Sequence, residues 1–243
     1  MSRSRPTLYQ FPISHYCEKA RWALEFKKIE YDIVNLVPGP HRSTAKKLGA
    51  PHSHTPILKD GDKVLQGSEQ IIDYLESKHP HPALTPTNAE AGSMAVEWAR
   101  FAEKNIGVPL RLYFYQHILP NRRLATRLLT EDCPWWAKPA YTLMFPTVRK
   151  VMRTGMKINA ENAEVAKQTL LRSFDQIENR LQDRQFLVDN RFTRADLAVI
   201  SLLAPCWRAI NDIPSELDDF IQSALQHKAL VWAQEVYASR RHA

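Results

Sequence analysis

A compact group of polar side chains stands at residues 14–21, where a strand-like segment gives way to a helical one. Residues 7–11 alternate and are rich in β-forming types, whereas the apolar positions after Ser14 follow helical spacing. Ser14 is therefore predicted to cap a helix, where unpaired backbone N–H groups and the positive end of the helix dipole favour an anion. Cys17 lies close to the same helix start, a position that lowers the pKa of a thiol. The junction is suited to sulfur chemistry.

Fewer residues outside the pair Ser14 and Cys17 have side chains that could take part in chemistry or bind a ligand. His15 could assist a deprotonation or hold a water molecule. Ser68 is predicted to cap a second helix by the same logic as Ser14, with Glu69 in the first turn. The histidine-containing segments 38–41 and 52–54 have no accompanying cysteine or acidic ligands, so we expect no metal site.

Composition narrows the class of protein. The 243 residues carry a net formal charge of +7, but lysine and arginine are interleaved with acidic residues along the chain. The densest basic groups, such as Arg122, Arg123 and Arg127, lie in no recognisable nucleic-acid-binding motif, so no nucleic acid partner is expected. No apolar run approaches the roughly 18 residues of a membrane span, and no signal segment is recognisable. Three distant cysteines indicate reduced thiols, and we expect a cytoplasmic protein.

The element pattern predicts two domains of different class. The expected strands are 7–11, 31–36, 56–59 and 63–66, and the expected helices beside them are 15–28, 42–48 and 68–78. This order is βαβ followed by ββα. Residues beyond a proline-rich stretch show helical patterns at 88–118, 122–131, 135–156, 161–183, 193–211 and 215–238. We therefore expect an α/β domain at 1–79, a linker at 80–87 and an all-helical domain at 88–243.

Four motifs follow one another along the chain in a specific order and spacing. They are Ser14-x-x-Cys17-x-Lys19-x-Arg21, Thr55-Pro56-Ile57-Leu58, Ser68-x-x-Ile71-x-x-Tyr74-Leu75, and Phe186-Leu187-Val188 with Phe192-Thr193-x-Ala195-Asp196-Leu197. In these motifs the chain resembles the soluble glutathione transferases over nearly its whole length. The resemblance implies a thioredoxin-like N-terminal domain and an all-helical C-terminal domain. By spacing alone, Thr193 and Asp196 also predict a helix-capping pair.

The resemblance implies that glutathione is the co-substrate. Ser14 would donate a hydrogen bond to the glutathione sulfur and lower its pKa, while Tyr9 is an alternative hydroxyl used in some classes of the family. A cis peptide bond between Thr55 and Pro56 would turn the backbone of Thr55 towards the ligand, and Ser68 would bind the γ-glutamyl carboxylate. The residues implied for glutathione binding are Thr55, Pro56, Ser68, Glu69, His41, Arg42 and His54, of which His41, Arg42 and His54 could meet the glycine carboxylate.

One position departs from the family pattern. Gly67 stands where an acidic residue or glutamine is usual, so a contact to the amino group of glutathione is missing unless Gln66 or Glu69 compensates. The first hypothesis is an enzyme of detoxification that conjugates glutathione to a small apolar electrophile. The alternatives are a non-catalytic protein of the same fold that binds an apolar ligand or a protein partner, and a thiol transferase that depends on Cys17. The resemblance also implies a homodimer.

Overall fold

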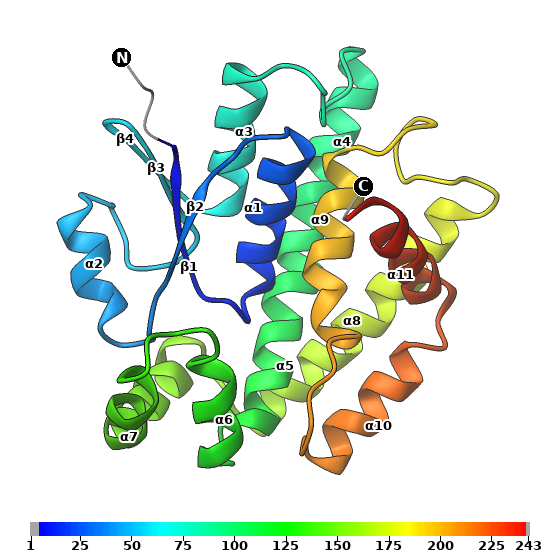
Figure 1. The fold of residues 1–243 in the computed structure, drawn as a ribbon. Helices are drawn as coiled ribbons and strands as arrows, with labels where there is room; N and C mark the ends of the chain where they lie inside the picture. Colours follow the sequence, from blue (N-terminus) through cyan, green and yellow to red (C-terminus); the bar gives the residue numbers. More distant parts are fainter. Residues whose placement is uncertain (1–4, 242–243) are drawn as a thin grey trace. The chain divides into compact units, whose positions relative to one another are not determined.

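The first third of the chain alternates strands and helices in the order that its sequence predicts. The computed structural model describes residues 5–241 (Figure 1). Its strands are β1 (Thr7–Gln10), β2 (Asp32–Asn35), β3 (Ile57–Asp60) and β4 (Lys63–Gln66). The helices beside them are α1 (His15–Phe26), α2 (His41–Lys47) and α3 (Ser68–Lys78). This order confirms the thioredoxin-like βαβ-ββα fold.

The register of the sheet brings four chain segments to one edge. The strand order is β2-β1-β3-β4, with β1 parallel to β2 and antiparallel to β3, and β3 antiparallel to β4. Gln10 pairs with Asn35, while Ile57 pairs with Tyr9 on one side and with Gln66 on the other. The ends of β1, β2 and β4 therefore lie beside the start of β3. The segments leading into α1, α2 and α3 all begin at this edge.

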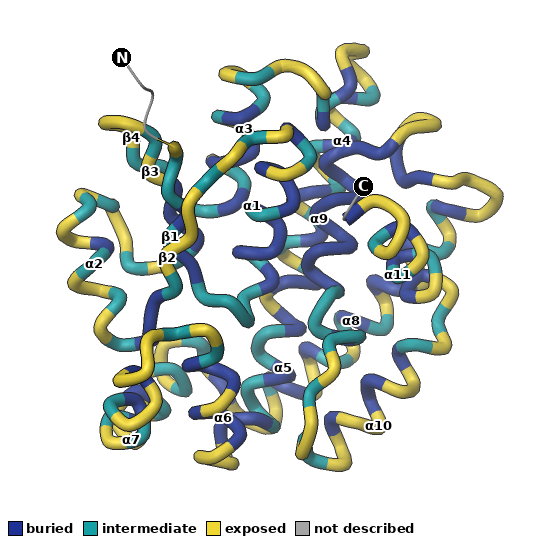
Figure 2. Tube along the Cα trace, viewed as in Figure 1, coloured by how far each residue is buried: buried dark blue, intermediate teal, exposed yellow. Residues whose placement is uncertain are grey.

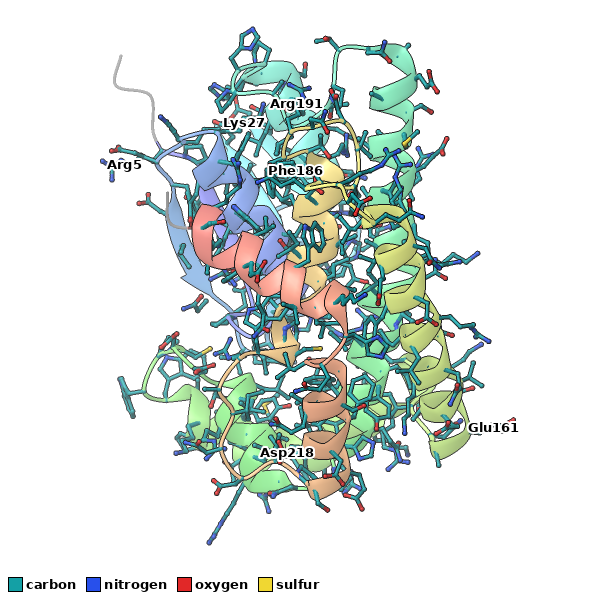
Figure 3. The ribbon with its side chains drawn as sticks, turned by 90° about the vertical axis from the view of Figure 1, so that its right-hand side faces the viewer. Arg5, Lys27, Glu161, Phe186, Arg191 and Asp218 are labelled. Atoms are coloured by element: carbon teal, nitrogen blue, oxygen red, sulfur yellow. The ribbon has the colours of Figure 1, made fainter. Side chains whose placement is uncertain are left out.

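The helices α1 and α3 cover one face of the sheet, and α2 lies on the other (Figure 1). Fully buried Lys19 of α1 forms an ion pair with Glu69 of α3. The buried ammonium group of Lys27, labelled in Figure 3, forms an ion pair with Glu76 and donates a hydrogen bond of 2.7 Å to the His79 carbonyl oxygen. Because a buried charge without its partner is costly, these pairs fix α1 against α3.

The rest of the chain is helical, as predicted. Its helices are α4 (Ala89–Ala102), the π-helix η1 (Glu103–Gly107), α5 (Val108–Ile118), α6 (Arg122–Leu129), α7 (Ala137–Gly155), α8 (Ala160–Leu181), α9 (Arg194–Leu203), the 3₁₀-helix η2 (Ala204–Cys206), α10 (Ser215–Ala224) and α11 (Lys228–Arg240). All residues of α9 are buried (Figure 2). None of the helices within residues 5–241 is long and apolar enough to cross a membrane.

The chain folds into two compact units, each made of two separate stretches of sequence. One unit comprises the residues up to Pro82 together with Ala125–Val148, and the other comprises Ala83–Leu124 and the residues from Arg149 onwards. Within the first unit, the Asn35 side chain donates a 2.9 Å hydrogen bond to the Asp132 carbonyl oxygen, and Cys133 Sγ donates to the Leu36 carbonyl oxygen at 3.4 Å. A segment from the helical region is thus fastened to the end of β2.

The single helix predicted over 88–118 contains a wider π-helical turn at Glu103–Gly107. Pro109 explains it, because a proline has no N–H group and its ring clashes with the carbonyl group four residues earlier. That carbonyl belongs to Asn105, and it accepts a 3.2 Å hydrogen bond from Ser173 Oγ of α8. The same hydroxyl lies 2.7 Å from the Thr169 carbonyl oxygen, so its single proton is shared and replaces the missing N–H group of Pro109 only in part.

Two other helix predictions are wrong in extent. The helix predicted over 193–211 ends at Leu203 and tightens into the 3₁₀-helix, because Pro205 cannot continue an α-helix. The helix predicted over 215–238 is two helices, α10 and α11. The first closes with i→i+3 bonds from the Gln226 and His227 amides, and His227 then turns to an extended conformation. No glycine or proline marks this break, so the periodic pattern concealed it.

The fourth motif is a folding element, as its spacing predicts. Thr193 and Asp196 form a capping box at the start of α9. The buried Asp196 carboxylate accepts hydrogen bonds of 2.8 Å from the amides of Leu187 and Thr193 and one of 2.9 Å from Thr193 Oγ1. Phe186, labelled in Figure 3, packs edge-on against Phe192 at 6.2 Å in the same loop. Burial raises the pKa of Asp196 to about 6, although these hydrogen bonds oppose the shift.

Candidate functional site

The candidate site lies at the sheet edge where α1, α2 and α3 begin. Ser14 precedes α1 in an extended conformation, and its Oγ accepts a 3.4 Å hydrogen bond from the Cys17 amide. The side chain is the N-cap that the sequence predicts, and it is partly exposed. Because the hydroxyl oxygen accepts this bond, its proton remains available to a group in front of the helix. Ser14 is thus placed to donate to an anion at the positive end of α1.

Cys17 lies beneath Ser14 and is fully buried. Its Sγ donates a hydrogen bond of 3.6 Å to Thr55 Oγ1, so the structure brings Ser14, Cys17 and Thr55 together. Burial raises the pKa of the Cys17 thiol, and hydrogen bonds with Ser14, Phe11 and Thr55 offset this only in part. A buried, protonated thiol is a poor nucleophile. The geometry favours Ser14 over Cys17 as the group that faces a ligand.

This difference predicts the pattern of thiol alkylation. At pH 7.5, iodoacetamide should leave Cys17 and Cys206 of the native protein unmodified, because burial raises both pKa values, that of Cys206 to about 12. The half-exposed Cys133 should react slowly, since desolvation also raises its pKa. Peptide mass spectrometry checks the result, and the same treatment in urea should label all three. Rapid modification of native Cys17 would contradict the assignment.

The Thr55–Pro56 peptide bond is cis, as the family resemblance implies. The Pro56 carbonyl oxygen accepts a 2.9 Å hydrogen bond from the Gly67 amide. This bond ties the segment before β3 to the segment before α3. A second cis bond, between His81 and Pro82, was not predicted from the sequence.

Ser68 is the first residue of α3 and is 2 % exposed. Its Oγ has no hydrogen-bond partner among the described residues. Within the same part of the chain no side chain caps α3, because the preceding Gly67 has none to offer. Gly67 also has a φ of 95°, which glycine adopts without strain. A buried hydroxyl without a partner at an uncapped helix start is suited to a small anion such as a carboxylate.

Gln66 and Glu69, the two residues that might replace a side chain at position 67, are engaged elsewhere. Gln66 Nε2 donates to the carbonyl oxygens of His52 and His54 at 2.7 Å each, and its Oε1 accepts from the His52 amide at 2.9 Å. Glu69 binds the buried Lys19. The imidazole of His54 instead lies over Gly67, with Nε2 3.7 Å from where a Cβ would stand. Sequence reasoning missed this arrangement, because only the fold brings residues 54 and 67 together.

His41 and Arg42 begin α2 at the same edge. The His41 ring lies 5.0 Å from that of Phe11, and its Nδ1 accepts a 2.9 Å hydrogen bond from the Gly39 amide. Burial lowers the pKa of His41, and the positive charge of Arg42 adds to this effect, so the imidazole is neutral at pH 7. Arg42 is exposed. Of these two neighbours, Arg42 carries the positive charge.

The two remaining candidates flank these segments. Tyr9 lies in β1, where its side chain alternates with the buried Leu8 and Gln10 and so points to the other face of the sheet. His15 is buried and its ring lies 4.6 Å from that of Tyr16. Among residues 5–241, no three histidine, cysteine or acidic side chains gather as a metal-binding group.

Comparisons with known proteins match both parts of the chain to one family. Residues 8–83 match the family model of the glutathione S-transferase N-terminal domain, and residues 138–220 match that of the C-terminal domain. The chain is 26 % identical over 237 residues to glutathione S-transferase TCHQD of Arabidopsis thaliana, covering 95 % of this chain and 87 % of that protein. It is also 26 % identical over 223 residues to glutathione S-transferase Z1 of the same plant, covering 91 % of each.

A solved structure shares the fold over almost the whole chain. It is the glutathione S-transferase CsGST63524 of Ceriporiopsis subvermispora in complex with glutathione, which aligns with a TM-score of 0.69 at 18 % identity and covers 98 % of each chain. The two family models together span more than half of this chain, in the order that its four motifs predict. The chain therefore belongs to the glutathione S-transferase family.

Proposed function

We propose that this protein is an enzyme that binds glutathione, stabilises its thiolate and conjugates it to a small apolar electrophile. The observation that carries the proposal is the buried Ser68 hydroxyl, which has no partner among the described residues and stands at the uncapped start of α3. A ligand carboxylate there would satisfy both the hydroxyl and the helix amides. The cis Thr55–Pro56 segment lies between this anion position and Ser14.

The proposed role of each residue follows from its chemistry. The backbone of Thr55 pairs with the extended tripeptide, as an added strand pairs with a sheet edge. Ser68 and the α3 amides hold the γ-glutamyl carboxylate. Arg42 supplies charge for the glycine carboxylate, while the neutral His41, together with His54, contributes hydrogen bonding at most.

Ser14 acts on the sulfur atom. A free thiol has a pKa of about 8.5, so only a minor fraction is ionised at pH 7. The Ser14 O–H donates a hydrogen bond to the thiolate but not usefully to the thiol, and the α1 dipole adds to this preference, so the thiol pKa falls. The thiolate then attacks an electrophilic carbon and forms a C–S bond. In a substitution, the electron pair of the bond that breaks leaves with the displaced group. In an addition to a double bond, the carbanion that forms is protonated by water.

Replacing Ser68 with alanine should weaken glutathione binding about tenfold, because a hydrogen bond to a charged group is lost. Isothermal titration at several millimolar glutathione measures the change. Ser77, exposed near the end of the same helix, provides the control variant Ser77→Ala, which should bind as the wild type does. Equal affinity of Ser68→Ala and the wild type for glutathione would contradict the proposed anion-binding position.

A non-catalytic role is the second candidate, and the absence of a side chain at Gly67 favours it. Gln66 and Glu69 are committed to other partners, so the amino group of glutathione lacks an obvious acceptor in this region. Turnover of an aryl halide separates the two functions. An enzyme consumes glutathione, whereas a binding protein retains it without product.

We also propose a cytoplasmic homodimer, which the family resemblance implies. An open groove of about 400 Å³ on α4 and α8 supports a partner surface. It is lined by Met94, Glu97, Trp98, Phe101, Gln176 and Asn179. Sedimentation of the wild type and of a Trp98→Glu variant tests whether this groove lies in a dimer interface.

A further inference from the structure

Basic and acidic residues are interleaved over most of the chain, but most of its net positive charge lies in one segment. Residues 122–157, here called the basic aromatic segment, contain eight lysines and arginines and two acidic residues, in a chain of net formal charge +7. Arg122, Arg123 and Arg127 are exposed on α6, and Lys138 and Lys150 are exposed on α7. The segment therefore presents a strongly positive surface.

The same segment exposes large apolar side chains. Trp135 is 89 % exposed, Trp136 44 % and Leu143 82 %. The inward side of α7 is a separate stripe of buried residues, and Figure 2 shows exposed and buried residues alternating along α6 and α7. The exposed side chains therefore do not belong to the core. Single exposed leucines are common on protein surfaces, but two adjacent exposed tryptophans beside a basic helix indicate a partner.

The backbone that carries the tryptophans is held in place. The Asp132 carbonyl oxygen accepts the 2.9 Å bond from Asn35, and Cys133 Sγ donates to the Leu36 carbonyl oxygen at 3.4 Å. Trp135 follows two residues later. The indole rings thus project from an anchored turn, so burying them in a partner requires little ordering of the backbone.

We propose that the basic aromatic segment docks this protein on anionic lipid bilayer surfaces, with Trp135, Trp136 and Leu143 entering the headgroup region. Tryptophan favours the membrane interface, and lysine and arginine are attracted to anionic headgroups. A second copy of this chain would bring the same positive charge to the contact, so repulsion opposes self-association through this surface. A nucleic acid would also be attracted by the positive charge, but binding to it would not explain why Leu143 is exposed. The docking is peripheral, through a segment that is attached to the end of β2 beside the candidate glutathione site.

Vesicle co-sedimentation tests the proposal with the full chain. The protein should sediment with phosphatidylcholine vesicles that contain phosphatidylglycerol, and not with pure phosphatidylcholine vesicles. Binding should fall at least about tenfold in Lys138→Glu/Lys150→Glu and in 0.5 M salt, because the attraction is electrostatic. Trp135→Ser/Trp136→Ser and Leu143→Ser should also weaken it about tenfold. Tryptophan fluorescence should shift to shorter wavelength with anionic vesicles, and this shift should be lost in the double tryptophan variant.

Matched controls lie on other exposed surfaces. Lys104→Glu/Arg172→Glu changes the net charge equally, and Val165→Ser removes an apolar side chain that is 59 % exposed on α8. Both should bind vesicles as the wild type does, and circular dichroism should show all variants folded. The proposal is overturned if the wild type ignores anionic vesicles or if the controls lose as much binding as the segment variants. It is equally overturned if the tryptophan variant dissociates an oligomer, or if an oligonucleotide binds through the lysines while vesicles do not.

Discussion

Replacing Ser14 with alanine is expected to lower kcat/KM for conjugation of glutathione to a chlorodinitrobenzene by about 10²–10³. The variant loses the hydroxyl that we propose donates to the thiolate, so the pKa of bound glutathione should rise towards that of the free thiol. Thiolate absorbance of the complex measures that pKa against pH. Because the proposed positions of the ligand carboxylates lie elsewhere, KM for glutathione should change far less than kcat.

The controls separate chemistry from helix capping. Ser14 also caps α1, so alanine should cost about 1 kcal/mol of stability as well. Ser14→Asp keeps a capping oxygen but, when ionised, has no proton to donate, and we expect it to remain folded and inactive. Cys17→Ala should retain most activity. Full activity in Ser14→Ala with loss of activity in Cys17→Ala would instead establish the buried thiol as the working group.

Replacing Asp196 with alanine is expected to destabilise the fold by about 3 kcal/mol, because the buried amides of Leu187 and Thr193 lose their acceptor. Urea unfolding followed by circular dichroism measures the free energy of unfolding. Asp175→Ala, an exposed change on α8, should lie within about 0.5 kcal/mol of the wild type.

The pH dependence of the Asp196 effect has a defined sign. Its folded pKa of about 6 lies above the value of 3.8 for an unperturbed aspartate, so the folded state holds the proton more tightly. The contribution of Asp196 to stability is therefore full below about pH 4 and declines as the pH rises towards 6. The difference between wild type and Asp196→Ala should shrink over this range. A difference that grows with pH would show that hydrogen bonding, and not burial, controls this carboxyl.

Features encoded locally could be predicted from the sequence. Ser14 and the pair Thr193 and Asp196 act as helix caps, and a cap needs only its own turn. The neighbouring strands expected at 56–59 and 63–66, which pair as β3 and β4, were likewise predicted from local patterns. The cis peptide bond before Pro56 was predicted only through the family resemblance.

Features that depend on distant contacts could not be predicted. The separation of α10 from α11 occurs at Gln226 and His227, which carry no helix-breaking signal. The position of His54 over Gly67 requires the sheet register, and the attachment of Cys133 to Leu36 joins residues 97 positions apart. Ser68 could be predicted as a helix start, but its lack of a partner is a property of the packed structure.

The three hydrogen bonds of Gln66 have a consequence for ligand affinity. They hold residues 52–54 through the backbone, immediately before Thr55. A tripeptide that pairs with Thr55 therefore meets a backbone segment whose shape is already set, and the conformational entropy lost on binding is correspondingly small. Gln66 is 4 % exposed and all of these bonds go to the protein itself. If the proposed site is correct, Gln66 acts on ligand affinity only through the backbone that it holds, and it does not itself contact the ligand.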